Sequence, residues 1–177
     1  MEHRIVFAGF GGQGVLSMGM LVTYAGMLEG KEVSWLPSYG PEMRGGTANC
    51  NVIVSDEPVS SPIITEPTAA IVMNRPSLDK FESTVEKNGL LFINSSLIEV
   101  KSTRDDISVI YVPTNEIAGE LGNLRVANMV MLGAVLKKTQ VVSIKSVMDS
   151  FLKVLGENKA KLIPINERAL EAGMNAV

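Results

Sequence analysis

Three glycines near the start of the chain have the spacing of a phosphate-binding turn. The segment Gly9-Phe10-Gly11-Gly12-Gln13-Gly14 contains Gly-x-Gly-x-x-Gly directly after a short apolar run. In such a turn the first glycine allows a tight bend, the second lets the backbone approach a pyrophosphate, and the third lets a helix pack on a strand. The N–H groups at the start of that helix attract an anion. Candidate ligand-binding or subunit-docking residues are therefore Gly9, Gly11, Gly12, Gln13 and Gly14.

A dinucleotide site needs one more group, a carboxylate near the end of the second strand that binds the ribose hydroxyls. Residues 34–38 read Ser-Trp-Leu-Pro-Ser, and the nearest acids, Glu29 and Glu32, come earlier and should point away from a bound ribose. Three interpretations remain open. In the first, the turn binds NAD or FAD. In the second, its glycines serve only to let the helix pack on the strand. In the third, the turn contacts another subunit, or an anionic group that it shares with another subunit. We favour the third.

The loop at 36–47, "LPSYGPEMRGGT", offers a second set of candidates. Pro41 and the Gly45-Gly46 pair favour a compact turn from which Arg44 projects. An arginine there can hold a phosphate or carboxylate through two parallel hydrogen bonds, although pairing with Glu42 in solvent is the simpler alternative. We expect this loop to leave the same edge of the sheet as the glycine turn. Arg44, Gly45, Gly46 and Thr47 therefore join the candidate residues.

The elements that must position these residues alternate between strands and helices. Strands are expected at 4–9, 31–36, 47–56, 69–74, 90–95 and 107–113, and helices at 14–28, 77–88, 114–121, 125–138, 144–155 and after Pro164. This alternation predicts a Rossmann-like, doubly wound α/β fold with a mostly parallel sheet, helices on both faces and further helices at the C-terminal end. No linker or repeat is visible, so we expect residues 1–177 to form a single domain.

Two of the expected helices carry long charge-free stretches, 14–28 and 126–136. A helix that is apolar on every side must be covered on most of them, which would favour cover by a partner subunit. Within the second helix, Asn128 is expected to hydrogen-bond a neighbouring element rather than a ligand.

Composition excludes several classes of function. The net charge is −3 and Lys and Arg do not cluster, which argues against nucleic-acid binding and against a polybasic membrane anchor. No signal peptide or membrane span is recognisable. The single cysteine, Cys50, is expected in the core, and with only one histidine, His3, an intrinsic metal site is not expected. The chain is expected to be soluble and cytoplasmic, with little catalytic equipment of its own.

Five segments together resemble the gamma subunit of 2-oxoacid:ferredoxin oxidoreductases. They are "GFGGQGV", "PSYGPEMRGGTANC", "NRPSLDKF", "GLLFINSS" and "LGNLRVANMVMLGA", in this order along nearly the whole chain. The form of the loop around Arg44 looks more like the 2-oxoglutarate or branched-chain members than the pyruvate members.

The resemblance implies a multi-subunit complex that converts 2-oxoglutarate, coenzyme A and oxidised ferredoxin to succinyl-CoA, CO2 and reduced ferredoxin. In that family the alpha and beta subunits hold thiamine diphosphate with Mg, and iron–sulfur clusters lie in beta or in a small delta subunit. The gamma subunit has a docking role near the approach of coenzyme A. This chain should therefore bind no cofactor by itself and show no turnover alone. The alternatives are a stand-alone NAD- or FAD-binding module, or a gamma subunit for pyruvate or branched-chain 2-oxoacids.

Overall fold

Six strands form one mixed sheet in the order β2-β3-β1-β4-β5-β6. The computed structural model describes residues 1–38 and 47–177. The strands are β1 Glu2–Phe10, β2 Glu32–Ser38, β3 Thr47–Ser55, β4 Ala69–Val72, β5 Leu90–Asn94 and β6 Ser108–Val112. Strands β1, β4, β5 and β6 run parallel, whereas β3 is antiparallel to both of its neighbours, β1 and β2. The carboxyl ends of β1, β2, β4, β5 and β6 therefore meet at one edge of the sheet.

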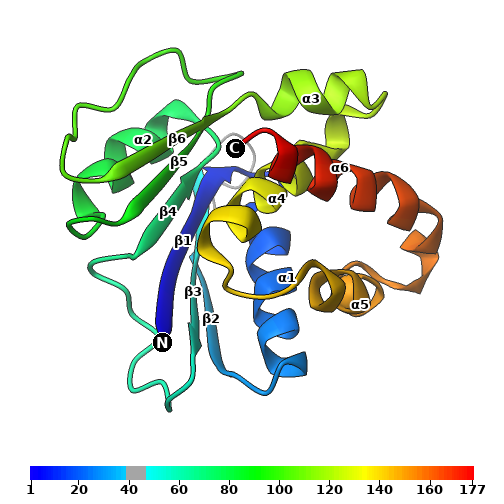
Figure 1. The fold of residues 1–177 in the computed structure, drawn as a ribbon, viewed down its shortest axis with the longest axis horizontal. Coiled ribbons are helices and arrows are strands. Elements are labelled where there is room, and N and C mark those ends of the chain that lie inside the picture. The colour runs from blue at the N-terminus through cyan, green and yellow to red at the C-terminus, as the bar shows by residue number, and fades with distance from the viewer. Residues whose placement is uncertain (39–46) are drawn as a thin grey trace.

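The helices are distributed unequally over the two faces of this sheet. They are α1 Val15–Leu28, α2 Arg75–Phe81, α3 Thr114–Glu120, α4 Ala127–Thr139, α5 Ile144–Leu155 and α6 Ile163–Asn175, with 3-10 turns at Glu82–Thr84, Leu124–Val126 and Glu157–Leu162. Figure 1 shows α1, α4, α5 and α6 together on one side of the sheet, and α2 on the other side beside β4 to β6. The larger hydrophobic core lies between the sheet and the first group of helices.

Local sequence explains where several helices begin and end. The Asn74 side chain accepts a hydrogen bond from the N–H of Ser77 at 2.9 Å, so α2 begins just after Asn74. The Ser143 hydroxyl accepts from the N–H of Ser146 at 3.1 Å and caps α5 in the same way. Helix α5 ends at Gly156, whose φ of 96° suits glycine.

Two glycines let α4 and α6 pack backbone against backbone. A Cβ atom on Gly133 would lie 2.8 Å from the carbonyl carbon of Leu170, and one on Gly173 would lie 2.7 Å from that of Val130. Real side chains do not approach a backbone so closely, so each glycine is required by its neighbour on the other helix. This contact fixes the distance between the two helices.

The predicted α/β class and the C-terminal helices are confirmed, and the six strands were predicted close to their observed bounds. The sheet is mostly parallel, as predicted, and it is mixed because β3 runs antiparallel between β1 and β2. Helix α2 begins at Arg75, two residues before the predicted start, and ends at Phe81 rather than at 88.

The interpretation of the charge-free helices was wrong, because this chain covers them itself. Helix α4 is buried against α1, α3 and α6, and residues 129–136 are all buried. Helix α1 is buried against β2, β3 and α5, and its strongly exposed apolar residues are Met27 and Leu28 at its C-terminal end. The absence of charge therefore reflects helices inside the core of this chain and does not indicate a partner.

Candidate functional site

The glycine turn lies where the sequence places it, between the end of β1 and the start of α1. Gly12 has a φ of 92° and Gly14, the residue that precedes the helix, has a φ of 74°. Both values fall in the left-handed region, which residues with a Cβ atom rarely adopt. Gly9, the last glycine of the strand, is required by crowding instead, since a Cβ there would lie 2.7 Å from the Gln13 side-chain oxygen and 2.9 Å from Val15.

Gln13 fixes the turn to the end of the neighbouring strand. Its side-chain oxygen accepts a hydrogen bond from the N–H of Phe10 at 2.7 Å, and its side-chain nitrogen donates to the carbonyl of Met73 at 3.1 Å. The Gln13 backbone N–H also donates to the carbonyl of Phe10 at 3.1 Å. One side chain thus connects both ends of the turn to the residue after β4, and the turn is held in a single shape.

The first pocket at this turn opens onto the N-terminus of α1. It has a volume of about 330 Å³ and is lined by Phe10, Gly11, Gly12, Gly14, Val15, Leu16, Ser17 and Ala48. Gly14 has no side chain that could cap the helix. The first N–H groups of a helix have no partner within it, and together they favour negative charge. This pocket therefore has the geometry and the polarity to bind an anion through the backbone.

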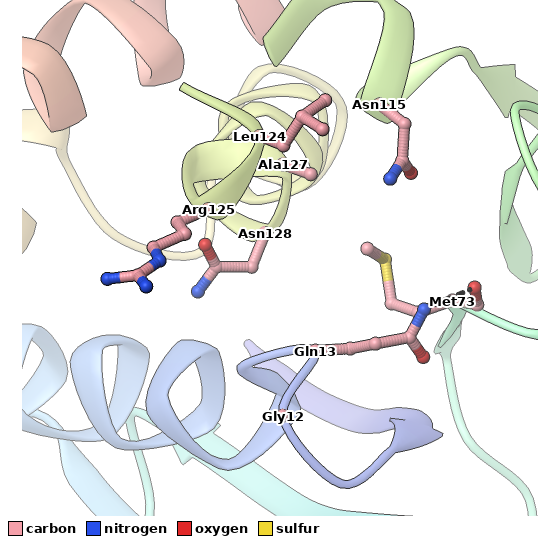
Figure 2. Close-up of a pocket in the computed structure, with 8 residues that line it drawn as sticks. All are labelled: Gly12, Gln13, Met73, Asn115, Leu124, Arg125, Ala127 and Asn128. Atoms are coloured by element: carbon pink, nitrogen blue, oxygen red, sulfur yellow. Dashed lines mark hydrogen bonds between the residues drawn. The ribbon is translucent and has the colours of Figure 1, made fainter. Parts of the chain in front are cut away.

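A second pocket, of about 250 Å³, lies on the other side of the same turn and is rich in side-chain amides (Figure 2). Figure 2 shows Gln13 and Met73 on one side of it, and Leu124, Arg125, Ala127 and Asn128 on the other. Asn115, which follows β6 and lies in α3, completes the lining. Amides can both donate and accept hydrogen bonds, and Arg125 adds a positive charge. The two pockets share Gly12 and lie on either side of the turn.

Asn128 connects α4 to the glycine turn. Its side-chain nitrogen donates to the carbonyl of Gly14 at 3.5 Å, at the outer limit of a hydrogen bond. A Cβ on Gly14 would lie 2.9 Å from the side-chain carbon of Asn128, so the amide also fills the space that the glycine leaves. The prediction that Asn128 bonds a neighbouring element is confirmed.

The second set of candidates is only partly described. Arg44, Gly45 and Gly46 lie outside the described residues. Thr47, the first residue of β3, is exposed and pairs with Phe10, and Ser38 ends β2 opposite Asn49. Ser38 and Thr47, the described residues on either side of 39–46, therefore lie at the edge of the sheet where the glycine turn lies, in agreement with the prediction.

The acids considered for a ribose lie at the other end of the molecule. Glu29 follows α1, and its carboxylate accepts a hydrogen bond from the N–H of Ser143 at 2.7 Å. Partial burial works against the charged form there, but hydrogen bonds from Ser143 and Ser146 outweigh it and lower the pKa of Glu29. Glu32, at the start of β2, is opposite Ser55. Among the described residues, neither pocket is lined by a carboxylate.

Cys50 and His3 are both outside the two pockets. Cys50 is fully buried under α1, its thiol lies 3.7 Å from the carbonyl of Val15, and burial raises its pKa to about 12. Its predicted place in the core is confirmed by this burial, and so high a pKa leaves the thiol unreactive. His3 lies near the start of β1, and burial lowers its pKa. Within residues 1–38 and 47–177, no group of three His, Cys, Asp or Glu side chains could hold a metal ion.

Sequence reasoning missed Asn115, Leu124 and Arg125. Asn115 could have been found, because it follows the carboxyl end of a parallel strand, where polar side chains converge on a ligand. Arg125 and Leu124 precede a buried helix, and only the packing of α4 against the turn brings them to the pocket.

None of the described helices has both the length and the apolar character required to cross a bilayer.

Fold and site together define an α/β domain with a glycine turn at the carboxyl edge of its sheet. The chain belongs to the pyruvate ferredoxin/flavodoxin oxidoreductase family, whose model matches residues 4–176. It is 40% identical over 172 residues to the ketoisovalerate oxidoreductase subunit VorA of Methanothermobacter marburgensis, covering 97% of this chain and 36% of that one. The chain therefore spans about a third of the length of that relative.

Other relatives match over most of their own length. The 2-oxoglutarate synthase subunit KorC of Methanocaldococcus jannaschii is 34% identical over 155 residues, covering 86% of this chain and 83% of the relative. The crystal structure of the gamma subunit of a keto/oxoacid ferredoxin oxidoreductase from Geobacter sulfurreducens superimposes with a TM-score of 0.82 at 28% identity, covering 98% of this chain and 97% of the other. The resemblance drawn from the five sequence segments is thus confirmed at the level of the family.

Proposed function

We propose that residues 1–177 form one gamma-type domain, a subunit of a thiamine diphosphate-dependent 2-oxoacid:ferredoxin oxidoreductase. The observation that carries this proposal is the family match over residues 4–176, supported by relatives of the same size named as KorC and gamma subunits. Alpha and beta subunits, with a delta subunit where one exists, would hold thiamine diphosphate, Mg and the iron–sulfur clusters. The described residues offer neither a cysteine cluster nor a metal-binding group of acids. The complex would act in the cytoplasm, with ferredoxin as its acceptor.

Within that complex we propose that the glycine turn faces coenzyme A. The pocket at the start of α1 faces the first backbone N–H groups of the helix, which have no partner within the helix, and a diphosphate is an anion that such a site can bind. The amide-lined pocket on the other side of Gly12 could then pair with the amides of the pantetheine arm. Arg44, Gly45, Gly46 and Thr47 are proposed to border the same ligand or the adjoining subunit. Among the described residues neither pocket is lined by a carboxylate that could bind a ribose, which disfavours a stand-alone NAD or FAD module.

Which 2-oxoacid the complex oxidises is a separate question. The loop around Arg44 resembles the 2-oxoglutarate or branched-chain members more than the pyruvate members, and the KorC relatives are consistent with 2-oxoglutarate. The higher identity to VorA, 40% against 34% for KorC, favours a branched-chain acid as the second candidate. Purifying the tagged chain anaerobically from its host, and assaying ferredoxin reduction with 2-oxoglutarate, 2-oxoisovalerate and pyruvate in turn, tests both. A chain that emerges without other subunits, or a complex inactive with all three acids, contradicts the proposal.

The coenzyme A contact is tested in the active complex. Arg44→Ala and Arg125→Ala should each raise the KM for coenzyme A about tenfold, because each removes a hydrogen bond donated by a charged guanidinium group. The KM for the 2-oxoacid should stay unchanged. Arg75→Ala is the matched control, since Arg75 is an exposed arginine on α2 that pairs with Asp79 at 2.8 Å, outside both pockets. An unchanged KM for coenzyme A in both variants would remove the assignment.

A further inference from the structure

The side chain of Asn94, beside the amide-lined pocket, is held in one orientation by backbone groups. Asn94 is the last residue of β5 and is fully buried. Its side-chain oxygen accepts a hydrogen bond from the N–H of Ser96 at 3.2 Å, and its side-chain nitrogen donates to the carbonyl of Met73 at 3.5 Å. A backbone N–H can only donate and a carbonyl can only accept, so the two ends of this amide cannot be exchanged.

Asn94 in turn fixes the amide of Asn115, which lines the pocket. The Asn94 nitrogen also donates to the side-chain oxygen of Asn115 at 3.0 Å, and the buried Thr114 hydroxyl donates to the same oxygen at 3.3 Å. The N–H of Asn115 donates to the Ser96 hydroxyl at 3.1 Å, which fixes its backbone as well. Figure 2 shows the end of the Asn115 side chain pointing into the pocket. Because its oxygen is occupied, Asn115 offers a ligand only its side-chain N–H groups.

Asn128 offers the opposite kind of group. Its side-chain nitrogen donates to the carbonyl of Gly14, which leaves its side-chain oxygen as an acceptor. Figure 2 shows Asn115 and Asn128 on opposite sides of the pocket. A donor therefore faces the pocket from α3 and an acceptor faces it from α4. A trans secondary amide has the matching arrangement, because its carbonyl and its N–H point in opposite directions.

We propose that the amide-lined pocket binds one secondary amide of the pantetheine arm of coenzyme A, an inference that rests on the proposed function. Asn115 donates to the carbonyl of that amide, and Asn128 accepts from its N–H. Asn94, which does not line the pocket, is a positioning residue that keeps the donor of Asn115 turned toward the ligand.

The place of this pocket favours coenzyme A over other ligands that contain an amide. The amide-lined pocket and the pocket at the start of α1 share Gly12. A ligand that occupies both must therefore carry an anionic group next to an arm that contains amides. Coenzyme A has this composition, since its diphosphate is joined directly to the pantetheine arm.

The test compares variants of the chain in the purified, active complex. Asn115→Ala should raise the KM for coenzyme A about fivefold and act neither on kcat nor on the KM for the 2-oxoacid, because one hydrogen bond to the arm is lost. ADP has a diphosphate but no pantetheine arm, so its inhibition constant against coenzyme A should stay the same. Asn175→Ala is the matched control, since Asn175 is an exposed asparagine at the end of α6 that lines neither pocket.

Asn94→Ala tests the positioning role. Without Asn94 the Asn115 amide is free to turn over, so the KM for coenzyme A should rise about threefold. Added to Asn115→Ala, the same change should raise the KM no further, because Asn94 acts through Asn115. Full additivity would contradict the positioning role. Thermal unfolding shows whether each variant is folded, and if Asn94→Ala is not, Asn115→Ala with ADP still decides the inference.

The outcomes separate this inference from the proposed function. If the wild-type complex does not depend on coenzyme A, or if ADP does not compete with it, the proposed function fails. If the wild-type complex behaves as expected but Asn115→Ala leaves the KM for coenzyme A unchanged, the inference alone is overturned. It is also overturned if Asn115→Ala weakens ADP by the same factor, which would show an effect on the whole turn. A loss of the other subunits on purification, with an unchanged KM, would mean that the pocket binds a peptide amide instead.

Discussion

At the scale of single residues, the turn between β1 and α1 contains two glycines that are needed for different reasons. Gly12 and Gly14 both have a positive φ, but a Cβ added at Gly12 would meet nothing within 4 Å, whereas one added at Gly14 would meet the Asn128 amide. The first position is therefore constrained by backbone conformation alone. The second is constrained by conformation and by a side chain from a helix more than a hundred residues later.

Alanine at these two positions should separate the two constraints. Gly12→Ala should cost about 1–2 kcal/mol of unfolding free energy, the strain of a left-handed residue with a Cβ. Gly14→Ala should cost about 1–3 kcal/mol more, because the new methyl group displaces Asn128. Denaturant unfolding of the isolated chain measures both. Adding Asn128→Ala to Gly14→Ala should recover part of the loss, and equal costs at the two glycines would contradict the role given to Asn128.

At the scale of elements, the reciprocal glycine contact joins α4 and α6: a Cβ added at Gly133 would lie 2.0 Å from the carbonyl oxygen of Leu170, and one at Gly173 would lie 1.8 Å from that of Val130. Gly133→Ala should lower the free energy of unfolding by roughly 3 kcal/mol or more, because the methyl group meets rigid backbone instead of a movable side chain. For a chain of this size that corresponds to a fall in Tm of about 6–12 °C.

Gly119→Ala provides the control for that variant. Gly119 also lies in a helix, α3, but a Cβ there would meet only Leu124, at 3.7 Å. Alanine should therefore leave the Tm unchanged or raise it slightly, because alanine has the higher helix propensity. A fall in Tm as large as that of Gly133→Ala would show that glycine itself, and not the packing of α4 on α6, sets the effect.

The contact between the end of α1 and the start of α5 should make stability depend on pH. The folded state lowers the pKa of Glu29 through hydrogen bonds from Ser143 and Ser146. A carboxylate of this kind stabilises the fold above its unfolded pKa, about 4.3, and the contribution is lost as the pH falls through the lower folded value. Because Glu29 is largely exposed, the contribution should stay below about 1 kcal/mol.

Glu29→Gln checks this dependence. The variant should be less stable than the wild-type chain at pH 7, and the difference should shrink as the pH falls below about 4. Thermal unfolding across pH 3 to 7 measures the two curves. Curves that stay parallel over this range would mean that the charge of Glu29 contributes nothing to the contact.

At the scale of the whole molecule, the sequence predicts the elements better than their direction. All six strands were expected near their observed bounds, because each is an apolar run ended by glycine, proline or a polar residue. The antiparallel course of β3 was not expected. Its alternation of buried Ala48, Cys50 and Val52 with Asn49 and Asn51 was a usable signal, since strands with one open face alternate in this way.

The candidate site shows the same limit. The glycine turn could be predicted because its chemistry lies within six consecutive residues. The pockets could not, because Asn115, Arg125 and Asn128 reach the turn only through the packing of α3 and α4. The spacing of residues along the chain predicts the turn, whereas the other residues that line the two pockets come together only in the tertiary structure.

The position of β3 has a consequence for how the sheet can assemble. Strand β3 follows β2 in the chain but lies between β2 and β1, so β2 has no neighbour in the sheet until β3 is in place. On that side of β1 the chain therefore cannot add strands one at a time in the order in which they are synthesised. Strand β3 has to pair with β1 before β2 can be added, or β2 and β3 have to be added together, whereas on the other side β4, β5 and β6 can each extend the sheet in turn.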